Sequence, residues 1–130
     1  MKEALEKAGV KLAISPGDVV TVKDKEIKFP LDPDREPHVR RFCVVLSSDI
    51  LCEKSPITAI LPLSHQVGLK SFADVYISRT KENGLERDSY AVMEQIQPIR
   101  RRDILERKGK LSLNDWEEIL RKMVENFDRA

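Results

Sequence analysis

The fold of this chain is decided by the stretch Arg40-Arg41-Phe42-Cys43-Val44-Val45-Leu46-Ser47-Ser48-Asp49. Phe42 to Leu46 is an apolar run rich in β-branched residues, and such a run between polar boundaries predicts a buried strand. A charged loop enters this strand, and Arg41 lies at the junction. Because rigid strand residues follow it, we expect Arg41 to be held in a fixed position.

Similar short apolar segments occur on both sides of this strand, each bounded by turn-forming residues. They predict four more strands, at Val19 to Val22, Ile57 to Leu63, Ala73 to Ile77 and Tyr90 to Met93. Short strands without long helices between them are expected to pair antiparallel. Pro62 predicts an edge or a bulge at the end of the third strand, because proline has no N–H to donate to a ladder.

The C-terminal region has the periodicity of an amphipathic helix. Its apolar positions recur at steps of three and four: Trp116, Ile119, Leu120, Met123, Val124 and Phe127. We expect this stripe to face the strands, and Ser112-Leu113-Asn114-Asp115 resembles a capping box that starts the helix. Ile99 to Glu106 predicts a further brief helix. Together these elements predict a mainly β fold, a small, partly open antiparallel β-barrel with short helices and a C-terminal amphipathic helix.

The chain divides into an N-terminal extension, residues 1–16, and a single barrel domain, residues 17–130. The extension includes Lys2 to Lys7, which is compatible with a short helical turn that Gly9 stops. Within the domain, the polar segment from Lys23 to Arg40 contains three prolines. Loops of this length inside compact domains are usually functional.

Composition limits the functions that the chain can have. Lys and Arg number 23, and Asp and Glu number 22, so the net charge is +1 and any affinity for nucleic acid must be local. Cys43 and Cys52 lack the spacing of a metal or redox site, and Cys43 is expected to be a small buried hydrophobe. The chain shows neither a secretory leader nor an apolar run of membrane length, and we therefore expect a cytoplasmic protein without a membrane contact, metal or cofactor.

An ordered series of motifs resembles the MazF/PemK/Kid family of toxin endoribonucleases. Gly17-Asp18 is similar to the family's opening Gly-Asp, and Arg41 with the following Val44-Val45-Leu46-Ser47 is similar to its Arg-Pro and apolar-strand-Ser block. Ser64 lies where members carry Thr or Ser, and Glu94-Gln95-Ile96 matches an acidic-Gln-hydrophobic block. The resemblance covers Gly17 to Phe127. Phe42 in place of the usual proline and Ser64 in place of the commoner threonine are departures from the family pattern.

This resemblance implies an SH3-like barrel that cuts single-stranded RNA at short sequences without a metal. It also implies a homodimer and an antitoxin whose disordered tail folds over the cleft. Arg41 and Ser64 would be the catalytic pair, and Glu36 a supporting loop acid. The expected RNA-binding residues are Arg40, His38, His65, Glu94 and Gln95.

The residue types suit that chemistry. Attack by a ribose 2'-hydroxyl requires a base, a positively charged group beside the phosphorane and a proton for the leaving oxygen. The fork of Arg41 matches phosphate oxygens, and Ser64 can donate and accept a hydrogen bond. Structural readings compete with these roles: Arg41 could be an edge arginine paired with Glu36 or Glu94, and Ser64 an ordinary turn serine. The general base stays open among Glu36, His38, His65 and Glu94.

Three further interpretations compete with the main one. His38 and His65 could act as an acid and base pair near neutral pH, or they could be ordinary surface residues. Because Phe42 and Ser64 depart from the family pattern, the chain could be a non-catalytic relative that binds RNA or a partner protein. Gyrase poisons of the CcdB type share the barrel and use a tryptophan near the C-terminus. Trp116 is predicted on the buried stripe of the helix, which disfavours that function.

Overall fold

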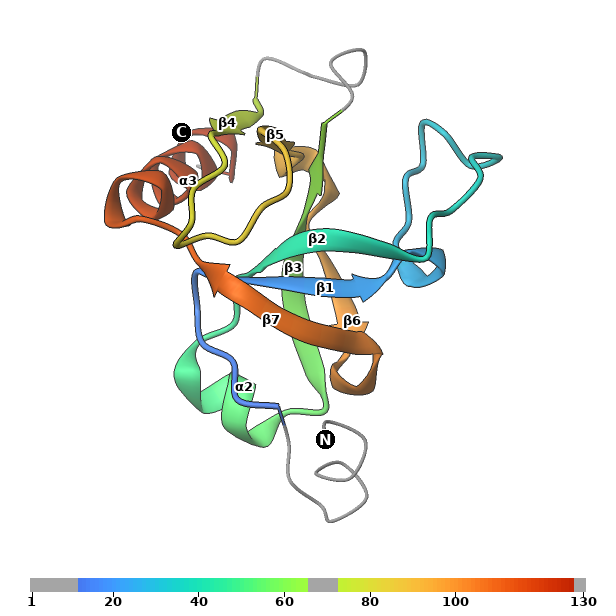
Figure 1. Cartoon of the computed structure of the whole chain (residues 1–130), viewed down its shortest axis with the longest axis horizontal. Coiled ribbons are helices and arrows are strands. Elements are labelled where there is room, and N and C mark those ends of the chain that lie inside the picture. The colour runs from blue at the N-terminus through green and yellow to red at the C-terminus, as the bar shows by residue number, and fades with distance from the viewer. Residues whose placement is uncertain (1–11, 66–72, 128–130) are drawn as a thin grey trace.

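The computed structural model describes residues 12–65 and 73–127, so the predicted turn over residues 2–7 lies outside the described residues, as does most of the 1–16 extension. Within these residues, seven strands and two α-helices follow in the order β1 (Asp18–Lys23), β2 (Arg40–Val45), α2 (Asp49–Lys54), β3 (Ile57–Ser64), β4 (Val75–Ile77), β5 (Ser89–Ala91), β6 (Gln97–Arg100), β7 (Ile104–Lys110) and α3 (Leu113–Phe127). The strands form one antiparallel sheet in the order β4-β5-β3-β2-β1-β7, and β6 pairs with β3 outside this path (Figure 1). The sheet is not closed, and the mainly β class with a C-terminal helix is confirmed.

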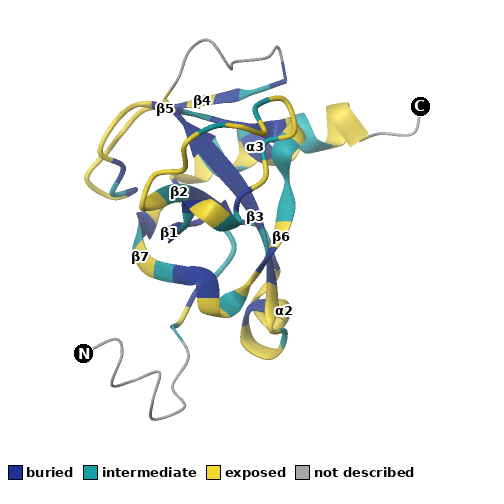
Figure 2. Cartoon of the chain, turned by 90° about the vertical axis from the view of Figure 1, so that its right-hand side faces the viewer, coloured by how far each residue is buried: buried dark blue, intermediate teal, exposed yellow. Residues whose placement is uncertain are grey.

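The central strands are apolar on both faces because both faces are covered. Successive side chains of a strand point to opposite faces, and neighbours in β1 and β2 accordingly contribute to two separate core clusters. Val19 and Val44 belong to the cluster under α3, whereas Val20 and Cys43 belong to the cluster on the other face. Figure 2 shows the resulting buried band along the strands. Cys43 is buried as predicted, and burial raises the pKa of its thiol, which keeps it protonated.

Pro62 does not mark an edge, because β3 is a central strand and Pro62 itself is buried. Its carbonyl accepts a 2.9 Å hydrogen bond from the amide of Val92. In a strand the N–H and C=O groups of one residue point to the same side. The position where Pro62 lacks an N–H therefore lies between the part of β3 that pairs with β6 and the part that pairs with β5. Ile60 is the last residue of β3 paired with β6, and Leu63 is the first paired with β5. The proline therefore costs the ladder no donor.

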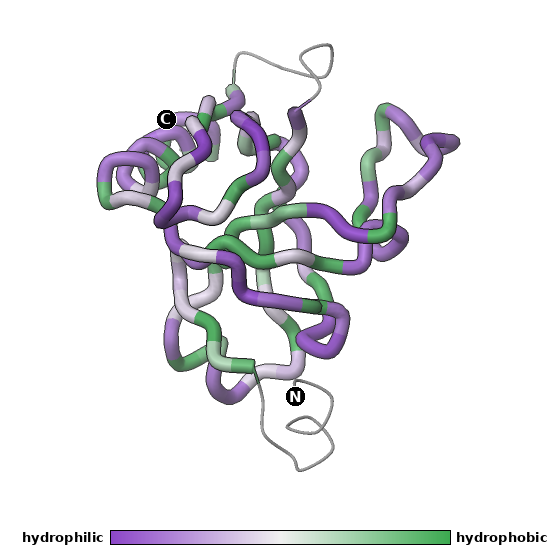
Figure 3. The backbone as a smooth tube through the Cα atoms, in the orientation of Figure 1, coloured by the Kyte–Doolittle hydropathy of each residue, from purple (hydrophilic) through white to green (hydrophobic). Residues whose placement is uncertain are grey.

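The brief helix predicted over Ile99 to Glu106 is wrong, since this segment holds the end of β6, one 3-10 turn over Arg101–Asp103 and the first part of β7. Ile99 pairs with Thr58 of β3, and Ile104 pairs with Val22 of β1. Two β-branched residues facing an existing sheet gain more from pairing than from a short isolated helix. Three elements, α2, β6 and β7, were absent from the sequence-based prediction. Figure 3 shows hydrophilic residues along much of β7, which hides the periodicity of a strand.

The C-terminal helix begins as predicted, because the Ser112 hydroxyl accepts a 3.1 Å hydrogen bond from the amide of Asp115. Its apolar stripe is only partly covered. Ile119 is fully buried, and Trp116 and Met123 pack against the core at its margin. The other three predicted stripe residues are exposed: Leu120, Val124 and Phe127. Among the described residues, no helix is both long enough and apolar enough to cross a lipid bilayer.

Candidate functional site

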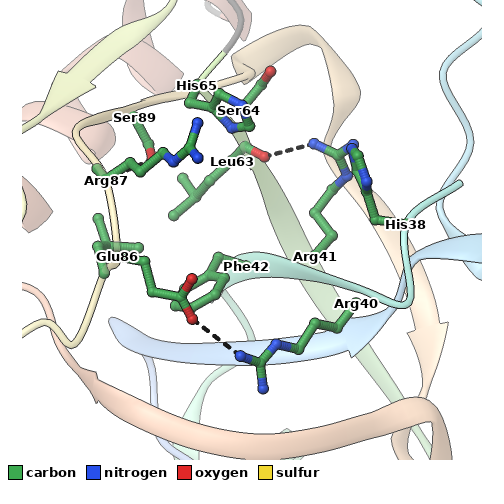
Figure 4. Close-up of a pocket in the computed structure, with 11 residues that line it drawn as sticks. His38, Arg40, Arg41, Phe42, Leu63, Ser64, His65, Glu86, Arg87 and Ser89 are labelled. Carbon is green, nitrogen blue, oxygen red and sulfur yellow. Dashed lines mark hydrogen bonds and ion pairs between the residues drawn. The ribbon is translucent and has the colours of Figure 1, made fainter.

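A pocket of about 240 Å³ opens where β2 begins and β3 ends (Figure 4). Its walls come from three places in the chain: the entry to β2, the end of β3 and the segment that precedes β5. The lining residues are His38, Arg40, Arg41, Phe42, Leu63, Ser64, His65, Leu85, Glu86, Arg87 and Ser89. Among the described residues, the lining therefore includes three arginines, two histidines, two serines and one carboxylate.

Arg41 is the most firmly held polar group of the pocket. Its Nε donates to Asp24 Oδ1 at 2.7 Å, and its Nη1 donates to the carbonyl oxygen of Leu63 at 2.9 Å. Its guanidinium carbon lies 4.8 Å from the centre of the Phe29 ring, which adds a cation–π contact. Only 14% of the Arg41 side chain is exposed. These contacts fix the plane of the guanidinium before any ligand arrives.

Asp24 is the partner of Arg41, in place of the Glu36 or Glu94 considered from the sequence. Burial alone would raise the pKa of this carboxyl, but hydrogen bonds from Arg35, Arg41 and the His38 amide lower it from 3.8 to about 2. Because the folded pKa is depressed, the pairing stabilises the fold above pH 3.8 and that contribution is lost as the pH falls toward 2. The shift corresponds to about 2 kcal/mol of unfolding free energy. Asp24 is thus ionised at any physiological pH.

The facing wall supplies a second cation and the hydroxyl. Ser64 is the last residue of β3, where its pairing with Tyr90 of β5 fixes its backbone. Figure 4 shows Arg87 reaching from the segment before β5 toward Ser64 and His65. Within the described residues Arg87 takes part in no ion pair. An exposed guanidinium beside a hydroxyl is suited to an anionic ligand.

Arg40 closes the mouth of the pocket through ion pairs. Its Nη2 lies 3.0 Å from a carboxylate oxygen of Glu86, and its Nη1 lies 3.3 Å from a carboxylate oxygen of Glu106. All three side chains are substantially exposed, so these pairs contribute little to stability. Figure 4 shows the Arg40–Glu86 pair across the lower side of the pocket. A ligand phosphate can therefore displace Glu86 from Arg40 at low cost.

The structure brings together five of the residues expected from the sequence: Arg40, Arg41, Ser64, His38 and His65. Three others do not line the pocket. Glu36 is exposed in the long loop, and Glu94 and Gln95 lie in the 3-10 turn Met93–Gln95 that follows β5. The pocket also contains Glu86, Arg87 and Ser89, which were not predicted from the sequence, and Asp24 binds Arg41 from outside the lining. Glu86, Arg87 and Ser89 belong to the Gly84 to Ile96 stretch, in which only Glu94 and Gln95 were predicted as site residues.

The groups of the pocket favour binding and turnover of a phosphate ester. Arginine forks bind phosphate oxygens, serine can donate or accept, and imidazoles can transfer protons near neutral pH. No cluster of three or more metal-binding side chains occurs in the part of the chain that the structure describes.

Several solved structures share this fold. No curated protein sequence matches the chain. Among solved structures, MazF of Deinococcus radiodurans superposes with a TM-score of 0.70 at 11% identity, covering 89% of this chain and 97% of that chain. The Mycobacterium tuberculosis toxin MazF-mt6 gives a TM-score of 0.66 at 15% identity, covering 85% and 96%. An endoribonuclease in complex with its cognate antitoxin, from a mycobacterial species, gives 0.59 at 9% identity, covering 87% and 91%.

At these identities the superpositions establish the shared fold, whereas the sequence itself establishes the family. Residues 15–127 match the model of the PemK-like, MazF-like toxins of type II toxin-antitoxin systems. This match spans the sheet, the pocket and the C-terminal helix. The chain belongs to the MazF/PemK toxin family of type II toxin-antitoxin systems.

Proposed function

We propose that this toxin is an endoribonuclease that cuts single-stranded RNA by attack of the ribose 2'-hydroxyl on the adjacent phosphate, without a metal ion. The observation that carries the proposal is the fixed guanidinium of Arg41 in one pocket with the Ser64 hydroxyl and two imidazoles. These are the group types that such a reaction requires. A solved mycobacterial relative is itself described as an endoribonuclease.

Arg41 would stabilise the negative charge that develops on the phosphorane. Its Nε and Nη1 are bound to Asp24 and Leu63, and within the described residues Nη2 forms no hydrogen bond. A donor held in place before the reaction costs no reorganisation in the transition state. Ser64 would bind the phosphate or the ribose, and Arg87 would neutralise a neighbouring phosphate. Because a guanidinium is not a proton donor in proteins, the proposed role of Arg41 is electrostatic.

His38 and His65 are the better placed candidates for proton transfer. Figure 4 shows His38 beside Arg41 and His65 beside Ser64, on the two sides of the pocket. Glu36 precedes His38 in the same loop but stays outside the lining, which makes it the weaker candidate for the base. For Glu94 and Gln95 we propose contacts with nucleotides that flank the scissile linkage.

The proposed partners follow from the family and from an uncovered surface. MazF of Deinococcus radiodurans has been solved together with MazE, and we propose that this toxin likewise binds an antitoxin whose disordered tail orders over the pocket. We also propose that the toxin is a cytoplasmic homodimer. The exposed apolar residues of α3 supply a surface for such contacts, since Val124 and Phe127 are 66% and 63% exposed.

Incubation of the purified toxin with a long RNA, followed by sequencing of the ends and analysis of their chemistry, tests the proposal. We expect cuts at a short sequence, 2',3'-cyclic phosphate ends, and full activity in excess chelator. Arg41→Ala should lower the rate about 100- to 1,000-fold. Lys54→Ala is the control, because Lys54 lies at the end of α2 and outside the pocket.

Three outcomes would contradict parts of this proposal. Full activity of Arg41→Ala would remove Arg41 from the mechanism. Loss of cleavage in chelator would require a metal. Intact RNA after incubation with the folded wild-type toxin would identify the chain as a non-catalytic relative.

A further inference from the structure

Asp24 lies at the centre of a buried cluster that joins the two ends of the long loop between β1 and β2. It occupies the first position of the 3-10 turn Asp24–Glu26, directly after β1, and its side chain is fully buried. Arg41, at the far end of the loop, donates to it from Nε at 2.7 Å. The backbone amide of His38 donates to its other oxygen, also at 2.7 Å.

The middle of the loop is bound to the same carboxylate. Arg35 donates to both carboxylate oxygens of Asp24, at 2.8 and 3.0 Å, and also to the carbonyl oxygen of Ile27 at 3.0 Å. The guanidinium carbons of Arg35 and Arg41 lie 4.7 and 4.8 Å from the centre of the Phe29 ring. One carboxylate and one aromatic ring therefore hold two like-charged guanidinium groups close together in a largely buried volume.

The strand register explains why this cluster forms here. Val22 of β1 is opposite Arg41 of β2, so Asp24 emerges just beyond the end of the β1–β2 ladder, beside the Arg41 side chain. Arg41 lines the pocket, whereas Asp24 and Arg35 do not. Asp24 thus contacts the proposed catalytic group from behind, on the side away from the site where a ligand would bind.

We propose that Asp24 is a positioning residue that sets the plane and location of the Arg41 guanidinium. The hydrogen bonds from Nε to Asp24 and from Nη1 to Leu63 together allow the guanidinium only one orientation. In this orientation, Nη2 forms no hydrogen bond within the described residues. The role of Arg35 is to hold the loop, and its bond to Asp24 does not orient Arg41. This inference rests on the proposed RNA cleavage, but its geometric content can be measured without that activity.

Asp24→Asn tests the inference in kinetics, because it keeps the shape of the side chain and removes the charge. We expect kcat to fall about 10- to 100-fold while KM changes by less than about threefold, since a misplaced donor affects the transition state more than binding. The rates are measured well below the Tm of each variant, so that the folded fraction is constant. Asp24→Glu, which restores the charge, should recover part of kcat.

Arg35→Gln is the matched control. It removes the other guanidinium from Asp24 and Phe29 but leaves the Asp24–Arg41 bond, so its kcat should stay within about threefold of the wild type. Asp24→Asn leaves two arginines together without a counter-charge and could therefore unfold the protein. The double variant Asp24→Asn/Arg35→Gln restores the net charge of the cluster, so it provides a folded protein in which Asp24 is also replaced. Its Tm should recover relative to Asp24→Asn, and its kcat should not.

The Nε–H signal of Arg41 in a proton–nitrogen NMR spectrum gives a readout that is independent of cleavage. In the wild type this proton should exchange slowly with water, and in Asp24→Asn/Arg35→Gln it should exchange at least about tenfold faster. Equal exchange rates in the two proteins would overturn the inference. So would an unchanged kcat in Asp24→Asn, or an equal loss of kcat in Asp24→Asn and Arg35→Gln. If the wild type does not cleave RNA, the proposed function fails and the NMR comparison alone decides the role of Asp24.

Discussion

Gly84 and Gly109 allow the turn before the pocket to lie directly against β7. A Cβ atom on Gly84 would meet the carbonyl oxygen of Lys108 at 2.3 Å, and one on Gly109 would meet that of Glu82 at the same distance. The amide of Lys110 donates to this Glu82 oxygen at 2.9 Å. Close approach of the two backbones holds the start of the segment that carries Glu86 and Arg87.

Gly84→Ala should destabilise the protein by about 3 kcal/mol or more, because it combines a left-handed backbone with a backbone clash. Gly17 is the matched control: its φ is +86° against +67° for Gly84, but its nearest neighbour is the Trp116 ring at 3.6 Å, an ordinary contact. Gly17→Ala should cost about 1 to 2 kcal/mol. Denaturant unfolding of both variants measures the difference, and equal losses would show that close packing at Gly84 is unimportant.

For single residues, the sequence predicted which candidate groups lie together better than it predicted their partners. Arg41, Ser64 and the histidines were predicted to share a cleft because each lies at the end of an apolar strand or beside one, and they line one pocket. Asp24 is 17 residues from Arg41 in the chain, and only the β1–β2 register brings the two together. Glu36 is nearer in sequence, but Arg35, its neighbour, is the loop residue that turns inward. Pairings of this kind depend on tertiary geometry that local patterns do not contain.

The C-terminal helix shows how far periodicity can predict an element. Six apolar residues at helical spacing predicted one covered stripe, and the helix and its Ser112 cap are where they were expected. The curved sheet covers only the side around Ile119, so the stripe is wider than its contact. The same reasoning failed for Ile99 to Glu106, where sheet pairing outweighed local preference. It also missed β7, whose charged residues conceal a strand.

Substitutions on the two sides of this stripe should therefore differ in effect. Ile119→Ala should lower the unfolding free energy by about 3 kcal/mol, because it leaves a cavity beneath the helix. Val124→Ala should change it by less than about 0.5 kcal/mol in dilute solution, where no partner chain covers this exposed residue. Denaturant titrations at several protein concentrations measure both effects. A large loss for Val124→Ala in dilute solution would mean that the Val124 side chain is packed against the rest of the folded protein.

In the whole molecule, positively and negatively charged side chains are nearly equal in number but are unevenly distributed. The net charge is only +1, yet the described lining of the pocket holds three arginines against one glutamate. The protein as a whole should not attract RNA, and binding should depend on a few phosphates that reach this pocket.

The salt dependence of RNA binding measures this local charge. With about three phosphates neutralised, a plot of log K against log salt concentration should have a slope of about −2 for single-stranded RNA that carries a 2'-deoxy nucleotide at the cleavage site. Arg87→Ala should reduce the magnitude of the slope by about 0.7. Lys54→Ala, at the end of α2 and outside the pocket, should leave it unchanged. An unaltered slope for Arg87→Ala would place the phosphate contacts elsewhere.

β4 and β7, the two ends of the strand order β4-β5-β3-β2-β1-β7, affect the tendency of the protein to aggregate at high concentration. β4 has only three residues, and β7 carries Glu106, Arg107, Lys108 and Lys110 along its length. A short strand offers few unpaired backbone groups, and a charged one repels an incoming neighbour. Both ends of this strand order are therefore poor templates for the addition of a strand from another molecule, although the interior strands are almost continuously apolar.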